Sequence, residues 1–270
     1  MRIGNREFDT AHHTYVMGIL NVTPDSFSDG GRYNTMDQAL YHAKKMVEEG
    51  ADILDVGGES TRPGHEQITE AEEIQRTAPV LERLKAEFDV PISIDTYKTS
   101  VAREALKAGA DLVNDIWGLK YDDGMAGLIA ESGAACCLMH NRREPVYDNL
   151  MAELKTDLRE SLGLAEQAGI PQSRIILDPG IGFGKTYPHN LEVMDKLEEL
   201  QELGLPVLLG TSRKSMIGLA LELPVEERLE GTLVTTVYGV TKGCAFVRVH
   251  DVKENVRAIK MAEAIRDGWR

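Results

Sequence analysis

The sequence predicts an α/β fold, a single eight-fold (β/α) TIM barrel, from two patterns and its length. Eight short apolar runs each end in a residue that can bind or react, and patterns with helical spacing separate them. Such a barrel needs polar residues at its strand ends, because its pocket is built there. The chain has 270 residues, close to the roughly 250 of one barrel, so we expect residues 1–270 to form one domain.

Each expected strand joins an apolar run to a reactive tip. The runs are 15–20, 52–54, 92–94, 112–113, 134–138, 175–177, 207–209 and 245–247. Their tips, in the same order, are Asn21, Asp55, Asp95, Asn114, Met139 with His140, Asp178, Thr211 and Arg248. Parallel strands joined by helices cross over in one hand, and eight such units close on themselves. The tips should therefore meet around one mouth.

Recognisable ends mark the helices between the strands. Thr35 with Gln38, and Thr69 with Glu72, have the spacing of a capping box, which predicts helix starts at these threonines. Further helices are expected at 100–108, 123–132, 149–168, 190–203, 227–241 and 252–266. Glycines that suit the end of a helix are Gly50, Gly109, Gly133, Gly169, Gly204 and Gly243. We expect residues 2–13 to form a short strand or hairpin that closes the end of the barrel opposite the strand tips.

Composition narrows the class of protein. Apolar residues make up 42% of the chain and charged residues 27%, as in ordinary globular proteins. No run approaches the roughly 20 apolar residues of a membrane span, and the beginning of the chain has no signal-peptide core, so we expect a cytoplasmic protein. With 44 acidic and 30 basic residues, the formal charge is −14. That excess argues against nucleic acid and anionic membranes as partners.

Cysteines and histidines give no sign of a zinc site. Cys136, Cys137 and Cys244 lie in apolar runs, and we expect them to be buried, reduced thiols. The seven histidines have no spacing typical of zinc ligands. His140 and His250 follow strand tips, which makes them candidates for contacts to an anion or a substrate.

Two long loops and one glycine-rich loop interrupt the repeat. Residues 21–34 and 57–69 are polar and rich in Gly, Pro, Ser and Asp, which is typical of lids or binding loops in a barrel. Residues 179–186 (PGIGFGKT) end like a phosphate-binding loop, but Pro179 stands where that motif needs glycine. We expect Gly180, Gly182 and Gly184 to keep the backbone thin beside a flat ligand, with Phe183 exposed.

The strongest chemical signal is the expected meeting of Asp95, Asn114, Asp178 and Lys214 at the mouth. Each aspartate alone could equally be a helix cap or turn residue. Together the four offer paired N–H acceptors, an amide and a cation. Because buried charges need partners, the set predicts a ligand with N–H and carbonyl edges.

A second group of polar residues predicts an anion site. Arg248 and His250 end the last strand, and Asn21 ends the first, which is its neighbour in a closed barrel. Arginine binds anions with a fork of N–H groups, and phosphate sites near strands 7 and 8 recur in this fold. An asparagine beside a diphosphate could also hold Mg²⁺, which takes few protein ligands.

The chain resembles the dihydropteroate synthase family in segments that span most of its length. These are GILNVTPDSFSDGG (18–31), DVGGESTRPG (55–64), SIDTYK (93–98), VNDIWG (113–118), LMH (138–140), ILDPGIGFGK (176–185), GTSRKS (210–215) and VRVHD (247–251). The resemblance implies condensation of 6-hydroxymethyl-7,8-dihydropterin diphosphate with p-aminobenzoate in folate biosynthesis. It also implies a sulfonamide target and a homodimer.

The resemblance assigns roles residue by residue. It implies that the pterin is held by Asp95, Asn114, Ile116, Met139, Asp178, Phe183 and Lys214. It implies that p-aminobenzoate is held by Phe27, Thr61, Arg62, Pro63, Phe183 and Ser215. The diphosphate would lie on Asn21, Arg248 and His250, with Mg²⁺ on Asn21. The residues expected to act in catalysis are Asn21, Asp95, Lys214 and Arg248.

Chemistry favours departure of the diphosphate before attack by the amine. An arylamine is a weak nucleophile, so we expect charge to be stabilised on the leaving group and on the pterin cation. Two alternatives stay open at this point. One is a corrinoid-type pterin-binding methyltransferase, which has no use for a diphosphate site, and the other is a pterin-binding protein without catalysis.

Overall fold

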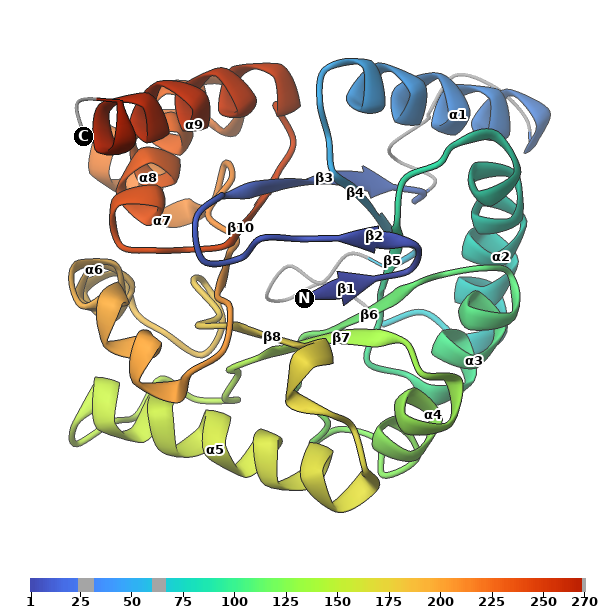
Figure 1. Cartoon of the computed structure of the whole chain (residues 1–270), viewed down its shortest axis with the longest axis horizontal. Coiled ribbons are helices and arrows are strands. Elements are labelled where there is room, and N and C mark those ends of the chain that lie inside the picture. Colours follow the sequence, from blue (N-terminus) through green and yellow to red (C-terminus); the bar gives the residue numbers. More distant parts are fainter. Residues whose placement is uncertain (24–31, 60–66, 269–270) are drawn as a thin grey trace.

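Eight parallel strands form the centre of the molecule (Figure 1). The structure is a computed structural model that describes residues 1–23, 32–59 and 67–268. The strands are β3 (Tyr15–Asn21), β4 (Ile53–Gly57), β5 (Ile92–Asp95), β6 (Leu112–Asp115), β7 (Ala135–Met139), β8 (Ile175–Asp178), β9 (Leu208–Leu209) and β10 (Phe246–Val249). All eight predicted strands are confirmed.

The strands close into a barrel, as the sequence predicts. Hydrogen bonds join them in the order β8-β7-β6-β5-β4-β3-β10-β9, and a parallel bridge between Leu177 and Val207 joins the two ends of the sheet. The register aligns tips of neighbouring strands, with Asn21 beside Gly57 and Asp95 beside both Gly57 and Asn114. Register therefore places the polar tips on one rim.

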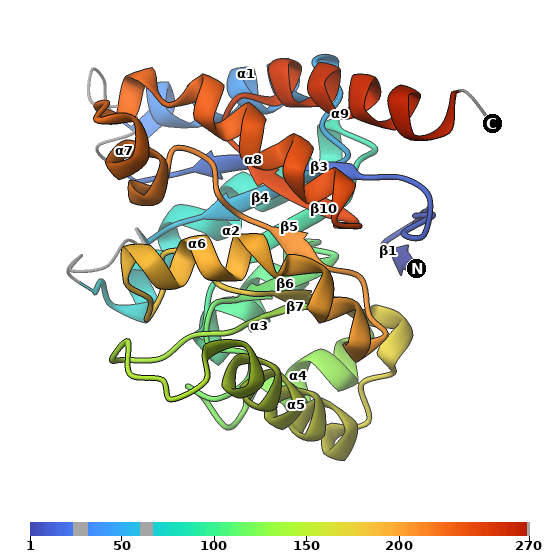
Figure 2. The same ribbon diagram turned by 90° about the vertical axis from the view of Figure 1, so that its left-hand side faces the viewer.

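Helices surround the strands (Figures 1 and 2). They are α1 (Arg32–Glu48), α2 (Glu70–Glu87), α3 (Thr99–Lys107), α4 (Met125–Ser132), α5 (Leu150–Ala168), α6 (Tyr187–Asp195), α7 (Ser215–Leu221), α8 (Leu229–Thr241) and α9 (Val252–Asp267). Short 3₁₀ helices are η2 (Gln172–Arg174), η3 (Leu197–Leu203) and η4 (Val225–Glu227). No helix within the described ranges is long and apolar enough to span a membrane.

The helices differ from the prediction in three places. Helix α1 begins at Arg32 and not at Thr35, because a threonine alone does not fix a helix start. The helix expected at 190–203 is α6, capped by Thr186, followed by the separate 3₁₀ helix η3. Apolar spacing continues through both segments, so it could not separate them. Helix α7 was not predicted at all. Thr69 does cap α2, with its Oγ1 accepting from the Glu72 N–H at 3.2 Å.

The amino-terminal hairpin closes one end of the barrel, which confirms that prediction. Strands β1 (Arg2–Ile3) and β2 (Arg6–Glu7) pair antiparallel and lie across the strand ring (Figure 1). Ile3 and Phe8 are buried with Met17 and Phe246 of the barrel interior. The Phe8 ring meets the Tyr15 ring edge-on at 4.8 Å. A second apolar core fills the space between strands and helices.

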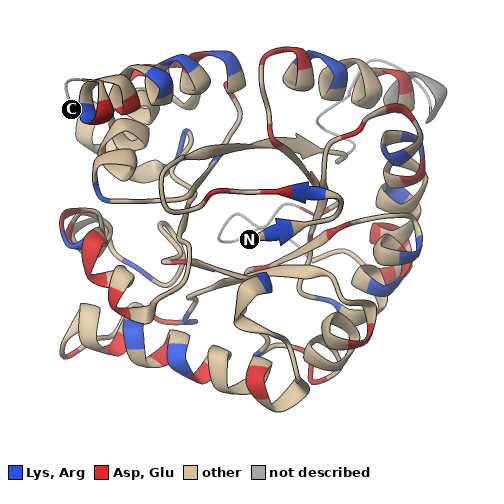
Figure 3. Ribbon diagram, viewed as in Figure 1, with Lys and Arg blue, Asp and Glu red and all other residues tan. Residues whose placement is uncertain are grey.

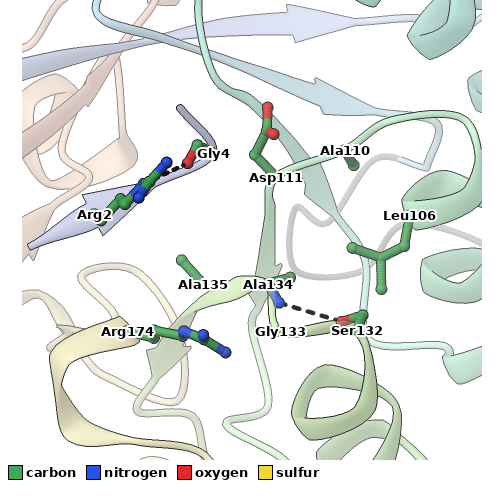
Figure 4. Close-up of a pocket in the computed structure, with 10 residues that line it drawn as sticks. All are labelled: Arg2, Gly4, Leu106, Ala110, Asp111, Ser132, Gly133, Ala134, Ala135 and Arg174. Carbon is green, nitrogen blue, oxygen red and sulfur yellow. Dashed lines mark hydrogen bonds between the residues drawn. The ribbon is translucent and has the colours of Figure 1, made fainter. Parts of the chain in front are cut away.

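Charged residues of both signs are interleaved along the outer helices (Figure 3). A cleft of about 390 Å³ lies at the amino-terminal ends of β6 and β7 (Figure 4). Its lining includes Arg2, Asp111 and Arg174, but the Asp111 carboxylate is already bound by Lys85 at 2.8 and 2.9 Å. The cleft is at the opposite end of these strands from their polar tips, so it is no part of the site described below.

Candidate active site

Three predicted site residues converge around Gly210, which follows β9. A Cβ atom at Gly210 would lie 3.7 Å from Asp178 Oδ2, 3.8 Å from Lys214 Nζ and 3.9 Å from Arg248 Cβ. These side chains come from β8, from the loop after β9 and from β10. The structure thus brings together residues that the sequence places far apart, and glycine leaves room between them.

Arg248 holds two buried carboxylates at the mouth. Its Nε donates to Asp55 Oδ2 and its Nη2 to Asp95 Oδ2, both at 2.6 Å. Asn114 Nδ2 donates to the same Asp55 oxygen at 3.3 Å. Burial works against the charge of Arg248, but Asp55 and Asp95 raise its pKa further above the usual range. The cation of Arg248 is therefore held firmly at the centre of the site.

One oxygen of the Asp95 carboxylate has no hydrogen-bond partner. Its Oδ1 is buried without a hydrogen-bond partner, and so is Asp55 Oδ1. Burial raises the pKa of Asp95 to about 7, although Arg248 opposes the shift. An unpaired buried acceptor is unfavourable, and an N–H group of a ligand would satisfy it.

Asp178 caps a turn with one oxygen and leaves the other facing the mouth. Its Oδ1 accepts from the Gly180 N–H at 2.7 Å, which is a turn-capping contact. Its Oδ2 faces the space around Gly210 and Lys214. Burial raises the pKa of Asp178, and Lys214 acts against that rise. One carboxylate thus fixes the glycine-rich loop and still offers an acceptor to a ligand.

Lys214 supplies a cation beside these carboxylates. Its Nζ donates to the Ile181 carbonyl at 2.5 Å and lies 4.8 Å from the centre of the Phe183 ring. Burial lowers the pKa of Lys214 to about 8, against the attraction of Asp178. The residue stands at the start of α7, the helix that the sequence pattern missed. Ser215, the first residue of that helix, is exposed beside it.

An apolar slot lies next to the charged groups. Ile116 and Met139 are buried together with Tyr97, and Phe183 and Trp117 pack against them. Phe183 is half-buried, so the expectation that it would be exposed is wrong. Tyr97 was not predicted as part of the slot. Flat apolar walls beside paired acceptors suit a planar polar heterocycle.

The glycines of the loop after β8 serve backbone packing. Gly180 and Gly184 have φ of 69° and 52°. A Cβ at Gly180 would lie 1.9 Å from the His140 carbonyl oxygen, and one at Gly184 would lie 2.4 Å from that of Arg142. Close backbone contacts therefore account for these two glycines without reference to a ligand. Only Gly182, whose Cβ would lie 3.3 Å from Lys214 Cδ, borders the site.

The two histidine candidates differ. The His140 side chain is buried, and both of its ring nitrogens have partners. Its Nε2 lies 3.0 Å from Asp157 Oδ2, and its Nδ1 lies 2.8 Å from Lys185 Nζ. Burial lowers the pKa of the imidazole to about 4, so the suggestion that His140 contacts an anion is wrong. His250 is half-buried at the mouth, where its Nδ1 lies 2.9 Å from Ser212 Oγ. Ser212, which the sequence did not single out, thus orients the His250 ring.

Comparison with known proteins identifies the family. A family model described as pterin binding enzyme matches residues 17–250. The chain is 59% identical to a dihydropteroate synthase of Clostridium beijerinckii, over 98% of this chain and 99% of that protein. A crystal structure of the Clostridium difficile enzyme in the presence of pteroic acid has a TM-score of 0.94 and 53% identity, covering 96% and 99% of the two chains. A Yersinia pestis dihydropteroate synthase with a sulfonamide drug has a TM-score of 0.92 and 42% identity, covering 99% of each.

The chain belongs to the dihydropteroate synthase family. It is therefore a transferase of folate biosynthesis, and the methyltransferase alternative falls away. Four predicted residues of the synthase, Phe27, Thr61, Arg62 and Pro63, lie outside the described residues, so their positions stay predictions.

The sequence predicts Asp55 at the mouth of the synthase but assigns it no role in the site. Asp55 is fully buried and binds both Arg248 and Asn114. In the sequence Asp55 follows an apolar run as Asp95 and Asp178 do, but in the structure it lies within β4 (Ile53–Gly57) and does not end it. A strand-tip pattern does not show that the Asp55 carboxylate binds other protein groups, namely Arg248 and Asn114.

Proposed function

We propose that this site condenses 6-hydroxymethyl-7,8-dihydropterin diphosphate with p-aminobenzoate, with the residues in the roles that the family resemblance implies. The observation that carries the proposal is the convergence of Asp178, Lys214 and Arg248 around Gly210, beside the unpaired Oδ1 of Asp95. None of these four groups alone indicates a particular ligand or reaction. Acceptors for ring N–H groups and a cation for an anionic leaving group are combined here at one mouth.

The pterin would lie in the apolar slot. Asp95 Oδ1 and Asp178 Oδ2 offer acceptors to its N–H groups, and Lys214 and Asn114 offer donors to its ring nitrogens and carbonyl. Ile116, Met139 and Phe183 would contact the ring faces. Crystallisation of a relative with pteroic acid, whose pterin part has the same edges, supports this assignment.

The diphosphate would lie at the side of the mouth where β3 and β10 are neighbours. Arg248 uses Nε and Nη2 on carboxylates, which leaves Nη1 for an anion. His250 follows Arg248 at the end of β10, and Asn21 ends β3. Positive charge and N–H donors here would stabilise the charge that grows on the leaving group.

The residues present also fit Mg²⁺. A Cβ at Gly57 would lie 3.4 Å from Asn21 Oδ1 and 3.9 Å from Asp95 Oδ2, so Gly57 leaves space beside two oxygen donors. Mg²⁺ prefers oxygen ligands and takes few from the protein. Asn21 would hold it, with remaining ligands from diphosphate and water. When bound, the ion would neutralise charge on the leaving group.

The bond to diphosphate would break before the amine attacks. Arg248 would hold the departing anion, and the Asp95 carboxylate would stabilise the pterin cation left behind. The amine would then attack the methyl carbon and lose a proton. Thr61, Arg62, Pro63, Phe27, Phe183 and Ser215 are the residues proposed for the amine, and a Xanthomonas albilineans relative crystallised with 4-aminobenzoic acid supports that substrate.

Diphosphate release, measured with and without p-aminobenzoate, tests the reaction. We expect dihydropteroate and diphosphate in equal amounts, and only with both substrates present. A protein that binds pterin without catalysis would release neither. The order of bond changes is tested with substrate carrying ¹⁸O in the bridging position. Exchange of the label without amine supports departure of diphosphate first, and its absence contradicts that order.

A homodimer and a cytoplasmic location also belong to this proposal. Exposed apolar side chains gather on α7, α8 and α9, namely Leu219, Leu221, Val234, Tyr238, Met261 and Ile265. Val240, near the end of the same helix α8, is buried within the chain. An apolar face of this kind favours a partner, and most soluble oligomers are symmetric dimers. Sedimentation velocity should show a dimer that Val234→Arg converts to a monomer.

A further inference from the structure

A row of polar side chains leads from α5 to the glycine-rich loop after β8, and the proposed reaction does not use it. The row ends at Lys185, whose Nζ lies 2.8 Å from His140 Nδ1. The same Nζ donates to the carbonyl of Gly180 at 3.0 Å and to that of Phe183 at 3.1 Å. Because an ammonium has three N–H groups, Lys185 uses all of them within the protein. The residue therefore acts on the loop and not directly on a ligand.

The other members of the row fix His140 as the acceptor for Lys185. Burial lowers the pKa of His140 to about 4, so its ring is neutral near pH 7 and carries one N–H. Burial opposes the charge of Asp157, but hydrogen bonds from His140 and Arg142 hold the pKa of this carboxyl below its usual range. The carboxylate of Asp157, 3.0 Å from His140 Nε2, takes the single N–H of the ring. The Nδ1 atom is then free to accept from the lysine.

The two carbonyls that bind the lysine are the ends of a turn that borders the apolar slot. The Phe183 N–H donates to the Gly180 carbonyl at 3.1 Å, which closes the turn. The Gly180 N–H donates to Asp178 Oδ1 at 2.7 Å, and the Ile181 carbonyl accepts from Lys214 Nζ at 2.5 Å. The turn thus contacts two of the residues proposed for the pterin and carries a third, Phe183.

The link from Lys185 joins two walls of the slot. His140 directly follows Met139, the last residue of β7, and Met139 is buried in the slot. Phe183 packs against the same group of side chains from the loop after β8. The turn already closes through its own backbone hydrogen bond, so Lys185 is not needed to form it. What the lysine adds is a fixed position of the turn relative to the end of β7.

We propose that Lys185 is a positioning residue for the pterin, which holds the Phe183 wall of the slot in place against the Met139 wall. This inference rests on the proposed function, which places the pterin in the slot. It differs from a purely structural role in one consequence. Loss of the link weakens binding of the pterin ring, while the gain in affinity from the diphosphate stays the same, because the proposed diphosphate site lies where β3 and β10 are neighbours.

Two variants and a control test the inference. Lys185→Met removes the ammonium and keeps a side chain of similar length, and His140→Phe removes one acceptor and keeps a ring. Lys155→Met is the matched control, since this lysine of α5 binds Glu199 at 2.8 Å and Glu202 at 2.9 Å, away from the loop.

Calorimetry gives the Kd of 6-hydroxymethyl-7,8-dihydropterin and that of its diphosphate with Mg²⁺. Burial lowers the pKa of Lys185 to about 7, against the attraction of Asp178. The measurements are therefore made at pH 6, where the lysine carries its proton and can donate to all three acceptors.

We expect Lys185→Met to raise both Kd values about tenfold, since hydrogen bonds from a charged group are lost. The ratio of the two Kd values should stay within about twofold of the wild-type ratio. His140→Phe should raise both values about threefold, because the lysine keeps its two carbonyls. The control should match the wild type within about twofold.

Wild-type affinity for the pterin in Lys185→Met, or a changed ratio of the two Kd values, overturns the inference. If Lys185→Met does not fold, the same two outcomes in His140→Phe decide. A wild type that binds no pterin would refute the proposed function as well. A wild type that binds pterin and forms dihydropteroate, beside a Lys185→Met variant of equal affinity, would refute this inference alone.

Discussion

The two ends of the barrel satisfy their side chains in opposite ways. At the hairpin end, Ile3 and Phe8 fill the interior with Met17 and Phe246 and are almost fully buried. At the mouth, the half-buried guanidinium of Arg248 holds two buried carboxylates. The first end uses apolar contacts, which are stabilising without further partners. The second keeps charges whose burial is costly unless each is paired.

Two buried oxygen atoms at the mouth, one on Asp55 and one on Asp95, have no hydrogen-bond partner. In the part of the chain that the structure describes, four buried side-chain atoms lack a hydrogen-bond partner, and they are Asp55 Oδ1, Ser93 Oγ, Asp95 Oδ1 and Thr99 Oγ1. They belong to β4, to β5 and to the start of the helix after β5. Proteins keep few such atoms, and usually for a reason. The comparison indicates that the hairpin end supplies stability which the mouth gives up for binding.

Arg248→Met should have the largest effect on stability. It leaves Asp55 and Asp95 buried without their cation, and breaking a buried ion pair on one side costs about 3–5 kcal/mol. Urea unfolding measures the loss. Adding Asp95→Asn to this variant should restore part of it, because one unpaired charge disappears. A single variant as stable as the wild type would show that Arg248 does not hold the mouth together.

Phe8→Ala should destabilise the other end by about 3 kcal/mol, because a large buried ring is lost and the hairpin fills the space only in part. The pterin Kd of the folded protein should not change, since Phe8 packs at the end opposite the strand tips. Urea unfolding and calorimetry on the same variant test both statements. A weaker pterin affinity would mean that the two ends are coupled and that the contrast between them is wrong.

The fold could be predicted because its signals are local. Apolar runs with polar tips gave all eight strands, and Thr69 gave the cap of α2. The break between α6 and η3 has no such signal, since one apolar period runs through both segments. The short helix α7 could not be predicted either, because seven residues are too few to show a helical period in the sequence.

The chemistry of the site could be predicted only in part, for a related reason. Strand tips name the residues at the mouth, but not which of them pair with each other. That Arg248 binds Asp55 depends on contacts across a barrel between residues 193 positions apart. The Tyr97–Glu59 hydrogen bond likewise joins two motifs across 38 positions. Such pairings join residues that are far apart in the chain, so no local sequence pattern contains them.

Asp178→Asn should weaken pterin binding by about 1.5–3 kcal/mol, since a charged acceptor is worth more than a neutral one. The effect on stability should be smaller, because the amide oxygen can still accept from the Gly180 N–H. Calorimetry with the pterin measures the affinity, and Asp195→Asn, at an exposed residue at the end of α6, is the control. Equal affinity in the Asp178 variant would remove this residue from the pterin site.

The pH dependence of stability should also separate the two ends. The pKa of Asp95 is raised from 3.8 to about 7, so between these values the native state holds a proton that the unfolded chain has released. The wild type should therefore lose stability relative to Asp95→Asn as pH rises from 4 to 7, by at most about 1.4 kcal/mol per pH unit. Phe8→Ala should keep the wild-type slope, because it removes no titrating group. Urea unfolding at several pH values gives all three curves. Parallel curves for wild type and Asp95→Asn would mean that the pKa of Asp95 is not raised in the native state. Burial of this carboxylate at the mouth would then cost less stability than its unpaired oxygen indicates.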